Sequence, residues 1–211
     1  MLSDKEREKF DFLQKIALKM GAVDTKLVTT DNIYVENRVT LKCKLGCISY
    51  GKKLTCPPHV PTPNEFREIL GEYQYAMLVK FKSPAEADEE LICSIYKYWL
   101  DPDTPKDIKE KADNFWTDCF DYGKEVLDIM LELEKAAFNR GYTFALAFTN
   151  GSCRLCEVCN TASGICIHPS RARISEHAVG VNIVKTAKEA GMELKFPVSG
   201  HPEPMTLLLI E

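Results

Sequence analysis

The sequence predicts one α/β (α+β) domain, a sandwich in which helices pack on a roughly four-stranded mixed sheet. Segments with a helical apolar repeat alternate along the chain with short runs of apolar, aromatic and β-branched residues, a pattern typical of helices that cover a sheet. The chain has 211 residues, of which 45% are hydrophobic, so a single domain over 1–211 can bury a sizeable core. A ferredoxin-like βαββαβ arrangement is one form that such a sandwich can take.

Ordinary start and stop signals define the elements of the first half. Ser3 and Glu6 have the spacing of a capping box, apolar residues then recur at helical intervals, and Gly21 stops the helix. The residues from Tyr73 to Phe81 are mostly aromatic and aliphatic, as in a buried strand. We therefore expect a helix over 4–20, a strand over 22–30, an irregular segment over 31–63, a short helix over 63–71 and a strand over 73–81.

The second half contains a long amphipathic helix. Thr104 is a natural N-cap with Pro105 at the first helical position, and Gly141 supplies the stop. The aromatic and apolar stripe between them is interpreted as core packing. Asn182 caps a further helix that Gly191 ends. We expect helices over 85–98, 105–140 and 182–190, and strands over 142–149 and 205–210.

The composition argues against several classes of function. A formal net charge of −4 gives no basic footprint for nucleic acid. No apolar run reaches the roughly 18 residues of a membrane-spanning helix, and the N-terminus lacks the apolar region of a secretory signal. Phosphate-binding glycine motifs and the serine-hydrolase motif do not occur in the sequence. We therefore expect a cytoplasmic protein whose thiols are kept reduced.

Seven of the nine cysteines fall into two groups whose spacing is typical of metal ligands. One group follows the pattern Cys-x3-Cys-x8-Cys-Pro-Pro in the loop 41–60, and the other follows Cys-x2-Cys-x2-Cys-x6-Cys in the loop 151–170. Because disulfides are rare in a reducing compartment, we expect these thiols to bind metal. The predicted ligands are Cys43, Cys47, Cys56, Cys153, Cys156, Cys159 and Cys166, whereas Cys93 and Cys119 are expected to be buried apolar residues.

Thiolates select iron–sulfur clusters, zinc or copper(I), and the spacing favours the first. Structural zinc is usually held by two separated Cys-x2-Cys pairs, whereas three thiols at intervals of three can reach three iron corners of a cubane, as in bacterial ferredoxins. We therefore expect one or two [4Fe–4S] clusters, with zinc as the alternative. The best-defined cluster site consists of Cys153, Cys156, Cys159 and Cys166.

The pairing of ligands between the two groups stays open at this stage. Cys166 is the local fourth ligand of the triplet, but a cysteine before proline can ligate the other cluster, so Cys56 could replace it while Cys166 joins the first group. If four of the seven thiols ligate one cluster, only three remain for a second metal site. Either His59 or His168 could complete that group or hydrogen-bond to it from outside, or one iron could keep an open position.

Basic residues flank both groups. They could raise the reduction potential of a negatively charged cluster, or they could simply keep the loops solvated. These residues are Lys42, Lys44, Lys52, Lys53, Arg154, Arg171 and Arg173.

The two motifs resemble those of a family described as predicted metal-binding proteins, to which no reaction is assigned. The segment from Leu41 to Pro58 carries Leu-Lys-Cys, Gly-Cys, Tyr-Gly-Lys and Cys-Pro-Pro in the family's order, and the triplet from Cys153 precedes a later cysteine, a proline and an alanine–arginine stretch. The resemblance extends from about Leu27 to Glu211. It implies a bound metal, iron–sulfur in kind, in the cytoplasm of an anaerobic microbe.

Three functions fit this pattern. The first is electron transfer, in which the protein passes single electrons to a redox partner protein or serves an anaerobic enzyme. The second is an enzyme that uses an open iron at a three-cysteine cluster, and the third is a structural or interaction module whose zinc pins the loops to the domain. Nucleic acid and membrane are not expected as partners, and the sequence leaves the oligomeric state and any substrate open.

Overall fold

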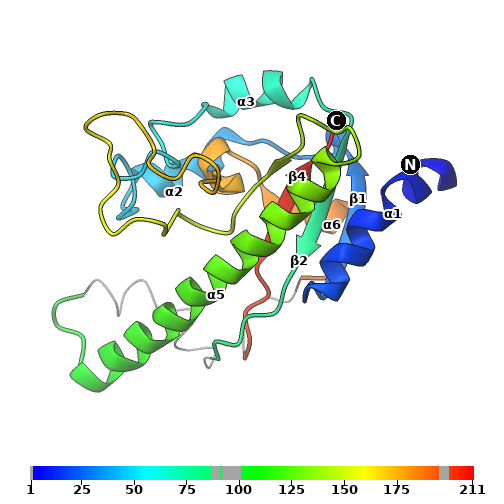
Figure 1. Cartoon of the computed structure of the whole chain (residues 1–211). Helices are drawn as coiled ribbons and strands as arrows, with labels where there is room; N and C mark the ends of the chain where they lie inside the picture. The colour runs from blue at the N-terminus through cyan, green and yellow to red at the C-terminus, as the bar shows by residue number, and fades with distance from the viewer. Residues whose placement is uncertain (1, 87–90, 92–100, 195–199) are drawn as a thin grey trace.

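The computed structural model describes residues 2–86, 91, 101–194 and 200–211, and these form an antiparallel sheet of four strands with helices around it (Figure 1). The strands are β1 (Asp24–Thr29), β2 (Tyr75–Lys80), β3 (Leu146–Ala147) and β4 (Met205–Leu209), in the spatial order β1-β2-β4-β3. All of β4 and the four inner residues of β2 are buried. The two central strands therefore need apolar cover on both faces.

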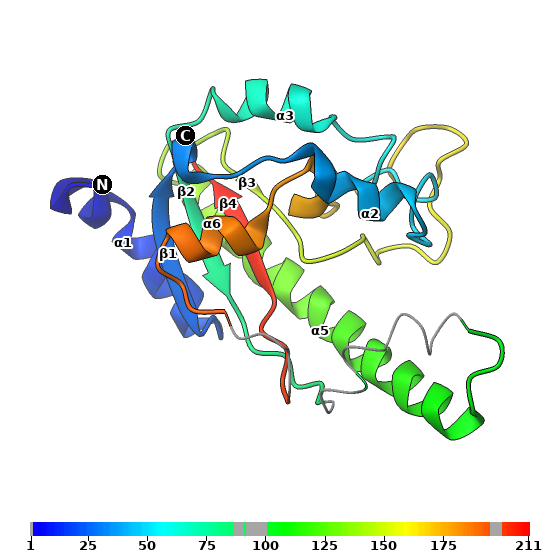
Figure 2. The same cartoon turned by 180° about the vertical axis from the view of Figure 1, so that it is seen from behind.

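Helices supply that cover on both sides of the sheet (Figure 2). One face carries α1 (Asp4–Lys19) and α5 (Lys106–Phe138), and the other carries α3 (Pro63–Leu70) and α6 (Ile183–Glu189). Successive side chains of a strand point to opposite faces. Accordingly, Met77 and Val79 pack with α1 and α5, whereas Ala76 and Leu78 pack with α3 and α6.

The other helical segments within the described residues are short. They are α2 (Leu41–Lys44) and the 3-10 turns η1 (Thr30–Asn32), η2 (Asn37–Thr40) and η3 (Glu176–Val179). Within the described ranges, no helix has both the length and the apolar character that crossing a membrane requires.

Most of the predicted elements are confirmed, including the α+β class and the four-stranded sheet. Ser3 and Glu6 form the capping box of α1, and Asn182 caps α6. Thr62 and Glu65 form a second capping box at α3, which was not predicted although the sequence contains Thr-x-x-Glu there. The helix expected over 85–98 lies largely outside the described residues, and Cys93 lies outside them entirely.

Three expectations need correction. The sheet is antiparallel throughout instead of mixed, because β4 lies between β2 and β3, which run in the same direction. Helix α5 begins at Lys106 with Pro105 as its N-cap residue, so Thr104 does not cap it. The strand expected over 142–149 is confined to Leu146–Ala147 at the sheet edge, where the Ala147 N–H bonds to a side chain instead of a further strand.

The ferredoxin-like arrangement stays an interpretation. If the chain order is started at β2 and the N-terminal elements are placed at its end, the result is β2, α5, β3, β4, α1, β1. This order corresponds to βαββαβ, with both helices on one face of the sheet. The actual chain order starts at α1 instead, and α3 and α6 add a second helical layer. The fold is therefore α+β, with an order of elements of its own.

Glu176 is an acidic side chain buried in this fold. It lies at the start of η3, is 1% exposed, and has Thr206 of β4 beside it. Burial raises the pKa of the Glu176 carboxyl to about 8, and the Thr206 hydroxyl, which favours the charged form, offsets only part of the rise. Among the described residues, Oε1 of Glu176 has no well-aligned hydrogen-bond partner. The folded protein therefore holds this carboxyl protonated at neutral pH.

Replacing Glu176 by Gln should stabilise the protein, and the gain should grow with pH. Below about pH 4.5 the carboxyl is protonated in both states, whereas from there to about pH 8 only the unfolded state releases the proton, so wild-type stability falls as the pH rises. At pH 7 the free energy of unfolding should differ by about 3 kcal/mol. Urea unfolding at several pH values measures this. The exposed Glu189→Gln is the control, and equal pH slopes in wild type and Glu176→Gln would contradict the assignment.

Candidate metal centre

The two cysteine-bearing loops, 41–60 and 151–170, lie side by side at one end of the molecule (Figures 1 and 2). Two hydrogen bonds join them across more than a hundred positions of sequence. The Leu54 N–H donates to the Cys159 sulfur at 3.4 Å, and the Lys53 Nζ donates to the Cys156 carbonyl oxygen at 3.1 Å. The fold therefore brings the two predicted ligand groups into one region.

The first loop turns back on itself around its three cysteines. Cys43 lies in α2, Cys47 is exposed, and Cys56 is buried. The Gly51 N–H donates to the Pro57 carbonyl oxygen at 2.9 Å and closes the turn between the second and third cysteines. Gly51 has a φ of +69°, a conformation that glycine adopts without steric cost. The glycine of the Tyr-Gly-Lys motif thus has a backbone role in placing Cys56.

The second loop leaves the end of β3 and is pinned where it rejoins the body of the protein. Arg173 forms a two-point ion pair with Glu134 of α5, in which Nε lies 2.8 Å from Oε2 and Nη2 contacts Oε1. The same carboxylate accepts the Ala147 N–H at 2.7 Å. Arg171 makes a more exposed pair with Asp128 at 2.7 Å. One glutamate of α5 therefore holds both the strand before the loop and the segment after it.

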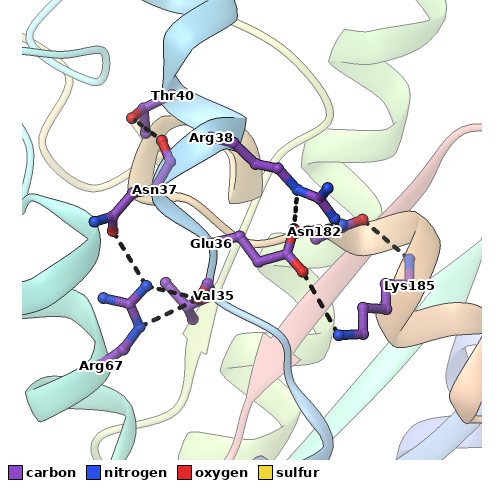
Figure 3. A network of polar contacts seen from close by, with 8 residues as sticks. All are labelled: Val35, Glu36, Asn37, Arg38, Thr40, Arg67, Asn182 and Lys185. Atoms are coloured by element: carbon purple, nitrogen blue, oxygen red, sulfur yellow. Dashed lines mark hydrogen bonds and ion pairs between the residues drawn. The ribbon is translucent and has the colours of Figure 1, made fainter.

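A polar network fixes the segment that leads into the first loop (Figure 3). Arg67 of α3 donates through Nε and Nη2 to the Val35 carbonyl oxygen at 3.2 and 2.8 Å. Glu36 accepts from Arg38 Nε at 2.6 Å and from Asn182 Nδ2 at 3.0 Å, and these hydrogen bonds, Arg38 first, lower the pKa of Glu36 to about 2. Helices α3 and α6 thus hold a stretch that the sequence presented only as irregular.

The thiols of the two loops lie within electrostatic range of one another. Burial raises the pKa of the Cys56 thiol to about 11, with further contributions from the two other thiols of its loop and a smaller one from Cys153. Burial also raises the pKa of Cys153, where Cys156 and Cys166 are the contributing thiols. Cys153 therefore neighbours both groups. A bound metal would reverse these shifts, because it deprotonates the thiols that coordinate it.

Two of the predicted basic residues interact with these thiols. Lys53 lies close enough to Cys153 to favour its thiolate form. Arg154 is attracted to the thiols of the first loop, and its guanidinium carbon stands 3.4 Å from the centre of the Phe120 ring of α5. The exposed members of the basic set are Lys42, Lys44, Lys52, Arg154 and Arg171.

The two histidines near the loops have other contacts. The His59 Nε2 lies 3.4 Å from the Gly51 carbonyl oxygen, and His168 donates its backbone N–H to the Cys166 sulfur at 3.4 Å. Ligation by either imidazole therefore stays a prediction. In the part of the chain that the structure describes, no three Cys, His, Asp or Glu side chains are grouped to hold a single ion.

The chemistry of the donor set fits a soft metal group. The region offers seven sulfur donors, and all seven are free thiols. A single zinc ion requires four ligands that converge on one point, whereas a cubane takes one thiolate at each iron corner and so accepts donors spread around it. These seven thiols are the sulfur donors that the region offers to either kind of metal group. Cys119, by contrast, lies in α5 and packs against an apolar cluster that includes Ala112 and Phe115, and burial raises the pKa of its thiol to about 11.

Comparison with known proteins gives one family. Residues 26–210 match the model of a family described as "Predicted metal-binding protein (DUF2284)", which confirms the resemblance to that family. Neither a curated protein nor a solved structure matches the chain. The family description supports metal binding and leaves the kind of metal unstated.

The Glu134 clamp should be a strong contributor to stability. Glu134→Ala should lower the free energy of unfolding by about 3 kcal/mol, because it leaves the largely buried Arg173 without its counter-charge. Asp128→Ala, which removes the exposed pair with Arg171, should cost less than about 1 kcal/mol and is the matched control. Chemical unfolding of both variants measures the difference, and similar losses in the two would contradict a special role for Glu134.

Proposed function

The chain belongs to the DUF2284 family of predicted metal-binding proteins, and from this premise we propose that it is an iron–sulfur protein that transfers single electrons. The observation that carries the proposal is the convergence of the two cysteine loops, joined by the Leu54–Cys159 and Lys53–Cys156 hydrogen bonds. Such a cluster, when bound, accepts and releases one electron at a time. The proposed setting is the cytoplasm, with a redox partner protein that exchanges the electron.

The neighbours of each thiol support ligation within each loop. Cys153 is influenced by Cys156 and Cys166, which favours Cys166 as the fourth ligand of the triplet Cys153, Cys156 and Cys159. After burial, the raised pKa of Cys56 owes more to Cys47 and Cys43 of its own loop than to Cys153 of the other. We therefore assign the [4Fe–4S] cluster to the second loop and a separate, adjacent three-thiolate site to Cys43, Cys47 and Cys56. The exchange of Cys56 and Cys166 between the sites is the less supported arrangement.

The surroundings suit a reducible group. A cubane with four thiolates carries net negative charge, so a nearby cation stabilises the more negative, reduced form. Lys53 lies beside Cys153, and Arg154 is held near the first loop by stacking on Phe120. Lys53 also orients the Cys156 backbone through its carbonyl oxygen. Lys53 therefore connects the two loops, and both side chains supply positive charge near the thiols.

The first loop supports a second candidate function. Its three thiols include the exposed Cys47, and the imidazole of His59 contacts the Gly51 carbonyl oxygen. A three-thiolate iron site in this loop would keep a coordination position open toward solvent, where a substrate could bind. Changes in the electron paramagnetic resonance signal on addition of small thiols or carboxylates would favour this enzyme over simple electron transfer.

Protein purified without oxygen should contain iron and acid-labile sulfide, and Cys156→Ala should lose the cluster of the second loop. Because metal binding and loop order are linked, the variant should also melt at a lower temperature. Cys119→Ala is the control, since that thiol lies outside both loops. Wild-type protein that contains zinc without sulfide would overturn the proposal in favour of a structural zinc module.

Cys56→Ala should distinguish local ligation from exchange between the loops. If ligation is local, the variant keeps the sulfide and iron of the second-loop cluster and loses only metal bound by the first loop. Under the exchanged arrangement, the same variant would lose the [4Fe–4S] signal as Cys156→Ala does. Metal and sulfide analysis together with visible absorption separates the two outcomes.

A further inference from the structure

Exposed apolar side chains are concentrated on the two cysteine loops. The loops form less than a fifth of the chain but carry six of the thirteen large apolar side chains that are exposed in its described part. Leu45 and Val158, one on each loop, are 84% and 83% exposed. Because the loops lie side by side, these residues belong to one end of the molecule (Figure 1). The six residues are Leu41, Leu45, Ile48, Val158, Ile165 and Ile167.

The same two loops differ from the rest of the chain in charge. They contain five basic residues and one acidic residue, a net of +4, in a chain whose net charge is −4, so the remainder carries −8. The segment 41–60 has four lysines and neither Asp nor Glu. Lys42, Lys44 and Lys52 are exposed, whereas Lys53 turns to the second loop. The end of the molecule that holds the thiols is thus basic and apolar on an otherwise acidic protein.

We propose that this end, defined by the six apolar residues and the three exposed lysines, is the docking surface for an acidic one-electron carrier protein. The inference rests on the proposed redox function and adds the partner's chemistry. Electron-transfer complexes are small and transient, and opposite charges on the two partners steer their encounter. The lysines would attract the carrier, and the apolar side chains would be covered on contact. One electron then moves from the carrier, which is oxidised, to this protein, which is reduced, and no bond forms.

Two other occupants of a basic, apolar surface fit the loops less well. Single-stranded nucleic acid is bound by stacking on aromatic side chains, and Tyr50 is the only Phe, Tyr or Trp in the two loops. Anionic membranes are bound by amphipathic helices with a long apolar face, whereas the helix of the first loop, α2, has four residues. Charge complementarity with an acidic protein is the remaining interaction that uses both the lysines and the irregular apolar loops.

The test uses metal-loaded full-length protein, with an acidic [2Fe–2S] ferredoxin as the probe and basic cytochrome c as the opposite-charge control. Binding is followed by calorimetric titration, and electron transfer by stopped-flow absorption. Between about 20 mM and about 300 mM salt, the association rate constant with the ferredoxin should fall at least about tenfold, because screening weakens steering. The rate with cytochrome c should not fall in this way.

The charge-reversal triple variant Lys42→Glu, Lys44→Glu, Lys52→Glu should lower both the affinity for the ferredoxin and the rate by about tenfold or more. The matched control is Lys106→Glu, Lys109→Glu, Lys111→Glu, three exposed lysines at the start of α5, which should leave both nearly unchanged. The pair Leu45→Ser, Val158→Ser should weaken binding without changing its salt dependence. Iron, sulfide and melting temperature are measured for every variant, so that loss of the site is not mistaken for loss of docking.

Three results would overturn the docking surface. One is equal behaviour of the two lysine variants, and another is ferredoxin binding that salt does not affect. The third is that the lysine triple variant weakens binding to vesicles of anionic phospholipid or to single-stranded RNA instead of binding to the ferredoxin. That result would identify a different class of partner. Failure of the proposed function has a separate signature, namely the lack of iron and sulfide in wild-type protein, and calorimetric binding is read independently of it.

Discussion

The pairing of the loops 41–60 and 151–170 is the constraint on which the candidate centre depends. Two hydrogen bonds join the loops, one to a sulfur and one from a lysine ammonium, and a typical hydrogen bond contributes only about 1 kcal/mol net to stability. Two such bonds cannot by themselves order forty residues that, apart from α2, lack regular structure, since each fixed residue costs about 1–2 kcal/mol of backbone entropy. The fold therefore holds the loops at their ends, and in the proposed centre a bound metal would hold them in between.

A few charged side chains of the folded body hold the ends of the two loops in place. On the side of the second loop, Glu134 of α5 accepts hydrogen bonds from Arg173 and from Ala147. On the side of the first loop, Glu36 and Arg67 tie the incoming segment to α6 and α3. Helix α5 therefore has two roles, because its apolar side covers the sheet while its polar and aromatic side chains, including Phe120 beneath Arg154, hold the second loop. The scaffold carries the site on elements that are rigid for reasons unrelated to metal.

Local signals in the sequence predicted most helices and strands, because capping residues, glycines and apolar periodicity act within a few positions. The capping box of Ser3 and Glu6 and the cap at Asn182 are examples. Sheet direction is not local: it depends on β4 entering between β2 and β3, which no single segment of sequence specifies. The same holds for the site. The spacing from Cys153 to Cys166 is local and predicts soft-metal ligands, but its closeness to Cys56 depends on the fold, and neither Glu134 nor Glu36 stands out in the sequence as an anchor.

The net charge of the whole chain says little about the charge of one small part of its surface, such as the end that carries the two loops. At physiological ionic strength the field of an exposed charge is screened within about 8 Å, so a partner approaching the loops senses the nearby lysines and hardly the acidic residues elsewhere. A chain at −4 can therefore present a basic end, and the choice between partners depends on what accompanies the charge. Here the companions are exposed leucine, isoleucine and valine side chains beside seven thiols. Exposed apolar side chains cost little singly, but their concentration around the proposed redox centre is what a partner that docks briefly, transfers an electron and leaves would require.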